Sequence, residues 1–374
     1  MKHILIDGTT ISHQMDGLTQ YILNVVLRLD VANYSYTLLL RPNECPERYL
    51  PLLQAKNIRI EEADIAPIGP LRDVQFAFYL RKHREFDAVL VPSNQYPLAL
   101  RLPAVYVIHD LIYEQFPEQL GRLGWLKRCY LRFVVRTGLR RAQTIVAVSK
   151  YTKSEIVRCY GKRFQDKIQV IYEGWEHLNN DQNNESARVD IPFEEYILYV
   201  GSSRGHKNLS RLVSAMQLYK HKLPENMGLV IVGNQKMFSS DQLRAIEEAN
   251  THRKLIKLTG WLSDEKLNYC FGAAKAVIFP SLCEGFGIPV LEAFFHKKPL
   301  LLSNRSSLPE VAGEAAIYFD PTDIKDIADK ILQVAKKEDF TDLVEKQNKQ
   351  LTKYSWHTTA NQITNIFQSI WHIK

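Results

Sequence analysis

Short apolar runs alternate along the chain with longer segments in which apolar residues recur at helical spacing. Such runs are typical of strands buried on both faces, and their alternation with helices predicts parallel sheets flanked by helices. In the first half, strands are expected at residues 2–7, 36–40, 58–60, 87–91, 104–108, 144–148 and 168–171. In the second half, they are expected at residues 196–200, 229–232, 256–258, 276–279, 300–302 and 316–319.

The alternation stops at residues 178–190, which are polar and rich in asparagine, as expected of a linker. A chain of 374 residues also suggests two domains, because single hydrophobic cores stop growing at roughly 250–300 residues. We therefore expect an α/β protein with two doubly wound, Rossmann-like domains. Ligands of such sheets bind beyond the carboxyl ends of the strands, so two facing sheets would form one site in the cleft between them.

The net charge of +7 belongs mainly to the first half: residues 1–180 hold 24 Lys and Arg against 18 Asp and Glu, and residues 181–374 hold 24 against 23. A basic half suits nucleic acid, an anionic membrane or a phosphorylated acceptor, and no RNA-binding or helix-turn-helix pattern favours nucleic acid. No apolar run approaches the ~18 residues of a membrane span, and the N-terminus lacks the apolar region of a secretory signal, so a cytoplasmic location is expected. The five cysteines lack metal-ligand spacing and are expected to be reduced thiols.

A glycine-rich turn joins one expected strand of the second half to a helix that starts at Pro289. Free N–H groups at a helix start attract an anion such as phosphate, and Gly285 and Gly287 let a ligand approach the main chain. Carboxylates are poor phosphate ligands, so Glu284 and Glu292 suit the hydroxyl groups of a sugar and of a ribose. The turn therefore suggests a nucleotide-sugar site, although an ordinary turn with a solvated Glu284 and a favourable first-turn charge at Glu292 would explain the same residues.

Two other strand ends contain side chains suited to such a ligand. After residue 200, a turn contains Arg204 and Lys207 and leads to Asn208, which is expected to cap a helix, so the turn suits a diphosphate. The strand at 104–108 ends in His109, where α/β domains present site residues. The turn with Arg204 and Lys207 could instead be an ordinary solvated turn, and His109 could be a structural residue.

The run from Glu284 to Ala293 has the Glu-x7-Glu spacing of glycosyltransferase family 4, the retaining nucleotide-sugar transferases, and closely resembles that family. Lys207 matches the lysine in a basic segment of the family. The family has an arginine next to this lysine, and this chain has His206 at that position. The run from Val107 to Tyr113 resembles the His-Asp segment of the mannosyltransferase-like members. Looser likenesses at residues 13–21, 304–313 and 354–360 extend the resemblance over essentially the whole chain.

The resemblance implies the GT-B fold, with an acceptor-side domain over 1–176, a nucleotide-sugar domain over 177–354 and a last helix, 355–374, that crosses back onto the first domain. It implies retaining transfer of a hexose, with mannose and GDP-mannose favoured, to a glycan or a polyprenyl-diphosphate-linked glycan during surface polysaccharide or lipopolysaccharide synthesis. Alternatives are a GT-B epimerase or phosphorylase and a non-catalytic sugar-binding module.

The family pattern also assigns roles to individual residues. Arg204 and Lys207 neutralise the leaving diphosphate, and His109 positions the donor sugar. No Asp-x-Asp metal clamp occurs in the chain, so neither a metal nor another cofactor is expected. The implied catalytic residues are His109, Glu284, Lys207 and Arg204, and the implied donor-binding residues are Gly17, Gly285, Phe286, Gly287, Ile288 and Glu292.

Residues 121–141 are expected to form the most basic helix. An apolar stripe of Leu123, Leu126, Tyr130, Phe133 and Val134 is expected opposite a cationic ridge formed by Arg128, Arg132, Arg136 and Arg140. The ridge would be either a solvated face or a contact with an anionic membrane, at about 1 kcal/mol per basic residue near the surface. In the second case, the protein would be peripheral at the inner face of the membrane.

Overall fold

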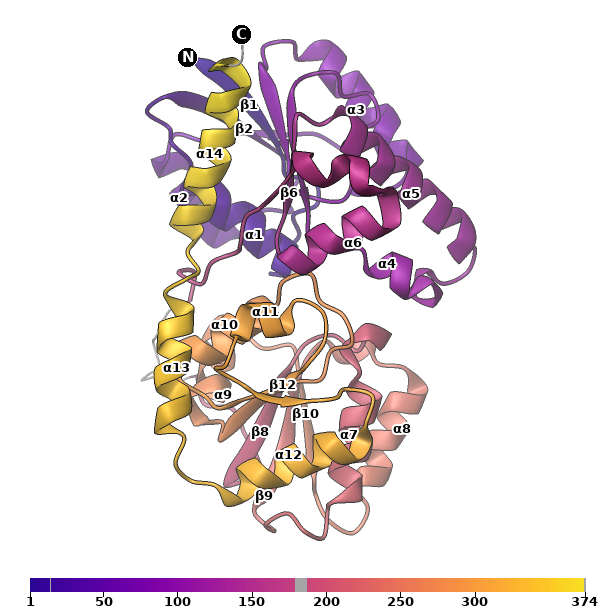
Figure 1. The fold of residues 1–374 in the computed structure, drawn as a ribbon, viewed down its shortest axis with the longest axis vertical. Coiled ribbons are helices and arrows are strands. Elements are labelled where there is room, and N and C mark those ends of the chain that lie inside the picture. Colours follow the sequence, from indigo (N-terminus) through magenta and orange to yellow (C-terminus); the bar gives the residue numbers. More distant parts are fainter. Residues whose placement is uncertain (14, 179–186, 373–374) are drawn as a thin grey trace. The chain divides into compact units, whose positions relative to one another are not determined.

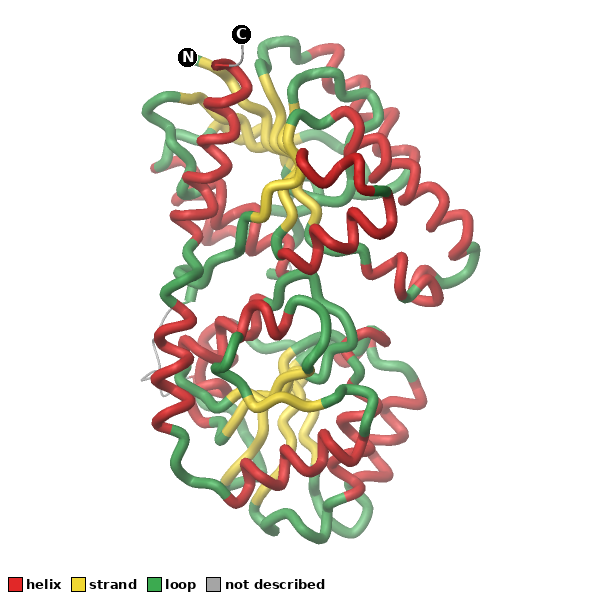
Figure 2. Tube along the Cα trace, in the orientation of Figure 1, coloured by secondary structure: helices red, strands yellow, loops and turns green. Residues whose placement is uncertain are grey.

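The computed structural model describes residues 1–13, 15–178 and 187–372, so most of the expected linker lies outside the described residues. The chain divides into two compact units, Met1–His177 with Tyr354–Lys374, and Leu178–Lys353. The boundaries expected from sequence fall one residue away from these, at 176/177 and 354/355. Each unit contains one parallel sheet flanked by helices (Figures 1 and 2).

The sheet of the first unit has the strand order β3-β2-β1-β4-β5-β6-β7, and every neighbouring pair is parallel. The order reverses at β1, as in a doubly wound sheet. Its strands are β1 (Lys2–Asp7), β2 (Tyr34–Leu40), β3 (Arg59–Glu62), β4 (Ala88–Val91), β5 (Ala104–Ile108), β6 (Thr144–Ala147) and β7 (Ile168–Val170). Its α-helices are α1 (Gly17–Val26), α2 (Leu50–Ala55), α3 (Pro70–Lys82), α4 (Ile112–Gln115), α5 (Gly124–Arg141), α6 (Lys150–Tyr160) and α14 (Trp356–His372), with 3-10 turns η1 (Glu47–Tyr49), η2 (Pro117–Leu120) and η3 (Lys162–Lys167).

The C-terminal helix α14 packs in the first unit. Trp356 is fully buried, its ring meets Tyr21 edge to face at 5.7 Å, and its indole N–H donates to Nδ1 of His177 at 3.0 Å. The carboxylate of Glu176 accepts the backbone N–H of Trp356 at 2.7 Å. A glycine is required at Gly174, because a Cβ there would lie 2.0 Å from the Trp356 nitrogen. The expected return of the last helix to the first domain is therefore confirmed.

The sheet of the second unit has the order β10-β9-β8-β11-β12-β13 and is also parallel throughout. Its strands are β8 (Glu195–Val200), β9 (Met227–Val232), β10 (Ile256–Gly260), β11 (Ala276–Phe279), β12 (Leu300–Ser303) and β13 (Ile317–Phe319). Its α-helices are α7 (Leu209–Leu218), α8 (Ser240–Ala249), α9 (Asp264–Ala273), α10 (Ile288–Phe295), α11 (Leu308–Ala312), α12 (Ile324–Lys336) and α13 (Thr341–Leu351), with 3-10 turns η5 (Gly205–Lys207) and η6 (Gln235–Met237).

Each expected strand is present, with its ends shifted by no more than two residues. The central strands β4, β5, β9, β11 and β12 are buried along their whole length, which explains why they read as continuous apolar runs. The doubly wound fold class is thus confirmed. Within the described residues, no helix combines the length and apolarity needed to cross a bilayer.

Candidate functional site

An ion pair links two strand-end loops of the second unit. Lys207 ends η5, which follows β8, and its ammonium donates to Oε1 of Glu284 at 2.7 Å. The two loops are also joined by the main chain, because Leu282 N–H donates to the carbonyl of His206 at 2.7 Å. Burial raises the pKa of the Glu284 carboxyl, but attraction and hydrogen bonding by Lys207 outweigh burial and hold that pKa below its usual value. Glu284 is therefore a carboxylate paired with a cation, not a solvated side chain.

The turn that contains Glu284 is held in place by two serines that follow β12. Ser306 Oγ accepts the Glu284 N–H at 3.0 Å, and the single O–H of Ser307 is shared between the carbonyls of Glu284 and Phe286, at 3.0 and 2.8 Å. The sequence analysis included this segment in the family resemblance but assigned no role to either serine. The two hydroxyl groups thus satisfy backbone groups of the turn without adding charge to it.

Helix α10 begins at Ile288, one residue earlier than expected, and Pro289 lies in its first turn. No side chain caps this start. Gly287 occupies the N-cap with φ +112°, a conformation that favours glycine, and a Cβ there would lie 2.9 Å from a Leu308 methyl group. The side chains of Phe286 and Ile288 are buried, so only their main chain can face a ligand at the helix start.

Glu292 lies one turn into α10. Burial raises the pKa of its carboxyl to about 7, repulsion from Asp264 adds to the rise, and attraction to Lys207 opposes it. The charge of Lys207 thus lowers the pKa of both glutamates of the Glu-x7-Glu pattern, against the effect of burial. A carboxyl that titrates near neutrality can gain or lose a proton when a ligand binds.

The loop after β8 differs from expectation at two residues. Asn208 precedes α7, as expected of a cap, but it makes no capping hydrogen bond and has a left-handed backbone with φ +60°. Its amide instead donates to the carbonyls of Pro280 and Pro321 at 3.0 and 2.7 Å, which joins three loops. His206 is buried, and burial lowers its pKa to about 4, so its ring is neutral at pH 7 and does not replace the family arginine as a cation. Arg204 is exposed.

In the first unit, His109 directly follows β5 and is enclosed by protein groups. Its Nε2 lies 3.0 Å from the carbonyl oxygen of Pro92, and its Nδ1 lies 3.2 Å from Oε1 of Glu173. Tyr21 from α1 meets the ring edge to face at 4.6 Å. Because a carbonyl only accepts, Nε2 must hold a hydrogen. Nδ1 then either accepts from a protonated Glu173 or donates to its carboxylate.

Glu173 is a buried residue that sequence reasoning did not select. Burial raises the pKa of its carboxyl, and the hydrogen bond from His109 opposes that rise. Glu173 lies just after β7, so the rule that site residues follow strand ends could have found it. Asp110 Oδ1 accepts the N–H of Ile112, the first residue of α4, at 3.1 Å, although the N-cap of that helix is Leu111.

Gly17 is the first residue of α1 and is exposed. The helix is capped by Asp16, whose carboxylate accepts the N–H of Thr19 at 2.8 Å. The Asp16 carboxylate adds negative charge at this helix start. It also occupies an N–H group that a diphosphate could otherwise bind. Gly17 itself stays a predicted ligand contact.

One group of described side chains has metal-ligand spacing, namely Glu61, His83 and Glu85, at one edge of the first unit. Glu61 already pairs with Arg59 at 2.5 Å and accepts from Tyr79 at 2.5 Å. The Arg59 ion pair and the Tyr79 hydrogen bond already engage the Glu61 carboxylate. None of these residues belongs to the strand-end loops described above.

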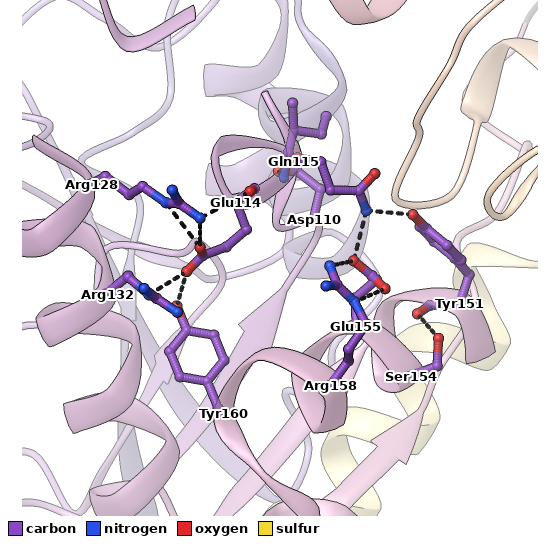
Figure 3. Close-up of polar contacts among 11 residues, drawn as sticks. Asp110, Glu114, Gln115, Arg128, Arg132, Tyr151, Ser154, Glu155, Arg158 and Tyr160 are labelled. Carbon is purple, nitrogen blue, oxygen red and sulfur yellow. Dashed lines mark hydrogen bonds and ion pairs between the residues drawn. The ribbon is translucent and has the colours of Figure 1, made fainter. Parts of the chain in front are cut away.

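The predicted cationic ridge on α5 is divided by an acid from α4. Figure 3 shows Arg128 and Arg132 directed at Glu114, whose side chain is almost completely buried. Arg128 Nη2 lies 2.9 Å from Glu114 Oε2, Arg132 Nε lies 2.9 Å from Oε1, and the hydroxyl of Tyr160 donates to Oε1 at 3.2 Å. Arg128 and Arg132 therefore neutralise a buried carboxylate. Of the four arginines in the predicted ridge, only Arg136 and Arg140 are left for an external ligand.

The apolar stripe expected on α5 is wrong in part. Val134 packs in the core, but Leu123, Leu126 and Phe133 face solvent.

The comparisons with known proteins agree with this fold. Residues 15–176 match the family model "Glycosyltransferase Family 4", and residues 181–355 match the model "Glycosyl transferases group 1". The O-antigen chain mannosyltransferase B of Escherichia coli is 26% identical, over 96% of this chain and 97% of that protein. The chain belongs to glycosyltransferase family 4, and it is a glycosyltransferase.

Solved structures support the fold. The sucrose-phosphate synthase of Thermosynechococcus elongatus superposes with a TM-score of 0.76 at 17% identity and full coverage of both chains. Anabaena Alr3699/HepE, solved in complex with UDP and glucose, superposes with a TM-score of 0.75 at 17% identity, over 99% of this chain and 100% of that one. The expected GT-B fold is confirmed by two Rossmann-like sheets and these neighbours.

Proposed function

We propose that this glycosyltransferase transfers a hexose, with mannose favoured, from a nucleoside diphosphate sugar to a glycan or a polyprenyl-diphosphate-linked glycan, with retention of configuration. The observation that supports it best is the Lys207–Glu284 pair beside the uncapped start of α10. The name of the E. coli relative favours mannose and an O-antigen type of acceptor. GDP-mannose is accordingly the first donor to test.

The chemistry is a front-face substitution at the anomeric carbon of the donor. The bond from that carbon to the diphosphate oxygen breaks, and a bond to the acceptor oxygen forms on the same face. The acceptor proton passes to an oxygen of the departing diphosphate, so no protein base is needed. Glu284 and Glu292 lie on one loop and one helix around an anion site, and we do not assign them the acid and nucleophile roles of a retaining hydrolase.

Lys207 stabilises the leaving group. An ammonium has three N–H donors, so Lys207 can keep its bond to Glu284 and still donate to a phosphate oxygen. The first turn of α10 adds its dipole, and exposed Arg204 adds a second cation at longer reach. Because these groups supply the positive charge, the reaction is proposed to need no metal ion, and we expect full activity in EDTA.

Glu284 accepts hydrogen bonds from sugar hydroxyls, and Glu292 accepts from the ribose. The Gly285–Gly287 turn and the main chain of Phe286 and Ile288 approach the diphosphate. In the first unit both ring nitrogens of His109 are engaged by Pro92 and Glu173, so we propose that His109 shapes the sugar pocket by contact and not by a free N–H. Gly17 is proposed to contact the donor or acceptor through its main chain.

Two measurements test the proposal. A thermal-shift series with GDP, UDP and ADP and their sugars identifies the donor, and GDP-mannose is expected to give the largest stabilisation among the sugars. The configuration of the new linkage, read by NMR of the product, is expected to match that of the donor.

An inverted product would exclude the retaining mechanism. Sugar turnover without a second sugar would favour an epimerase or phosphorylase. Tight donor binding without release of nucleoside diphosphate would favour a binding module. The predicted cytoplasmic location stays a prediction, which fractionation of cells that express the tagged chain would test.

A further inference from the structure

A cavity of about 680 Å³ lies in the second unit, at the amino ends of its strands. It is lined by Glu195 at the start of β8, residues 274–275 before β11, residues 297–299 before β12, and side chains between residues 337 and 345. Because neighbouring strands are parallel, their amino ends lie at the edge of the sheet opposite to the loops after β8 and β11. The cavity is therefore separate from the candidate donor site.

Four lysines line this cavity, and one of them is neutralised by the protein. Lys275 donates to both carboxylate oxygens of Glu195, at 2.8 and 2.9 Å. In the described part of the chain, no carboxylate forms an ion pair with the other three, Lys297, Lys298 and Lys337. Lys297 and Lys337 are exposed, whereas Lys298 is half-buried.

Three acids also line the cavity. The carboxylate of Asp339 accepts the N–H and the hydroxyl group of Thr341, at 2.9 and 2.8 Å, so it is engaged at the start of α13. Glu338 and Glu345 are exposed. The unpaired lysines therefore outnumber the exposed glutamates, and the lining has an excess of positive charge.

The main chain fixes Lys298 between α10 and β12. Its N–H donates to the carbonyl of Ala293 at 3.0 Å, and its own carbonyl accepts from Nε2 of Gln347, a fully buried residue of α13, at 2.9 Å. Burial lowers the pKa of the Lys298 amine. A larger share of this amine is therefore neutral than in an exposed lysine, and the neutral form is the nucleophile.

Lys167 in the first unit shows why the surroundings of Lys298 matter. Burial lowers the pKa of Lys167 as well, but its Nζ donates to the carbonyls of Leu139 and Arg140 at 3.3 and 3.2 Å. These bonds hold protons on the nitrogen. Within the described residues, Nζ of Lys298 has no such acceptor, and its side chain lines a cavity with room for a reagent.

The charges around Lys298 favour an anionic reagent. Lys297 precedes it in the chain, and the ammonium of Lys337 lies 5.1 Å from the centroid of the Phe340 ring, which lines the same cavity. Ammonium groups donate to phosphate oxygens. An acyl phosphate offers a phosphate to these exposed ammonium groups and a carbonyl carbon to the half-buried amine. A neutral acyl donor lacks the first attraction.

We propose that this cavity binds an acyl phosphate and that Lys298 takes the acyl group from it. The ammonium of Lys298 first loses a proton to water. Its nitrogen then attacks the carbonyl carbon, the bond from that carbon to the phosphate oxygen breaks, and the second proton passes to the departing phosphate. The products are an amide at Lys298 and hydrogen phosphate. The proposal needs no nucleotide sugar, so it is independent of the proposed transferase reaction.

Peptide mapping by mass spectrometry after incubation of the full chain with acetyl phosphate tests the proposal. Lys298 should be acetylated at least about threefold faster than Lys167 and than Lys346, an exposed lysine of α13 outside this cavity. The double variant Lys297→Gln, Lys337→Gln should slow acetylation of Lys298 by acetyl phosphate at least about threefold. With the neutral reagent N-hydroxysuccinimidyl acetate, the same variant should react within about twofold of wild type. Lys346→Gln is the matched control and should change neither rate at Lys298.

Two outcomes would overturn the proposal. Acetylation of Lys298 at the rate of Lys346 would show that the amine is not activated. Equal rates at Lys298 in wild type and in the double variant with acetyl phosphate would show that the cavity does not hold the phosphate. Unchanged circular dichroism would show that the double variant is folded, as expected for substitutions of exposed residues.

Discussion

Each unit of the molecule contains a carboxylate paired with a nitrogen base at a strand end, and the two pairs are in opposite electrostatic states. In the second unit, Lys207 holds the pKa of Glu284 below its usual value. In the first unit, burial raises the pKa of Glu173 beside His109. The Lys207–Glu284 pair therefore keeps two full charges beside a helix start. The His109–Glu173 pair can share one proton in the protein interior. The difference matches the proposed roles, in which the second unit binds the diphosphate and the first unit fixes the geometry of the sugar pocket.

Replacing Glu284 by glutamine should cause the largest loss, because it removes the negative charge that pairs with Lys207 and replaces one acceptor oxygen by an NH2 donor. We expect kcat/KM for transfer to fall about 10²–10³-fold, the usual effect of removing one preorganised polar group at a reacting centre. Initial rates of nucleoside diphosphate release measure it. Glu345→Gln, at an exposed position of α13, is the matched control and should retain wild-type rates. A Glu284→Gln variant with near wild-type kcat/KM would remove Glu284 from the site.

Replacing Glu173 tests whether the first unit needs a charge or only a hydrogen bond. Glu173→Ala should lower kcat/KM about 10–100-fold, because His109 loses the partner of Nδ1. Glu173→Gln should recover most of that loss, since an amide N–H can donate to Nδ1. Activity across pH provides the second readout, and the glutamine variant should lose any pH dependence that comes from the shared proton. If Glu173→Ala were folded and fully active, the positioning role would be wrong.

A smaller effect is expected from the pKa of Glu292, which burial raises to about 7. A raised pKa means that the carboxylate, the form that accepts from a ribose, predominates only above that pH. Donor affinity should therefore weaken about tenfold between about pH 8 and about pH 6, as the charged fraction falls. Calorimetric titration with GDP checks this, and Glu292→Gln should flatten the profile. An unchanged slope in that variant would assign the pH dependence to another group.

The strands, and the placement of the Lys207 loop and the Glu284 turn at strand ends of one sheet, followed from local signals, whereas the ion pair between Lys207 and Glu284 was not predicted. Each strand is a short apolar run, and parallel strands bring their carboxyl ends to one edge, so residues distant in sequence could be expected together. The start of α10 was found within one residue, because proline is favoured in the first turn of a helix.

Features that depend on partners from other segments could not be predicted. Asn208 has a good capping sequence context, but the carbonyls of Pro280 and Pro321 compete for its amide. The cationic ridge looked continuous because Glu114, which binds two of its arginines, belongs to another helix. On α5, apolar residues occur on two sides, and periodicity alone does not tell which side meets the core.

Release of GDP from GDP-mannose by wild-type protein and by Lys207→Ala is the measurement that tests the central claim most directly. If Lys207 stabilises the leaving diphosphate beside α10, the variant should still bind GDP-mannose but lose at least about 10²-fold in kcat. Lys207→Arg should retain part of the activity, because it keeps the positive charge. Wild-type kcat in a folded Lys207→Ala variant would contradict the assignment of the donor site to the Lys207–Glu284 pair.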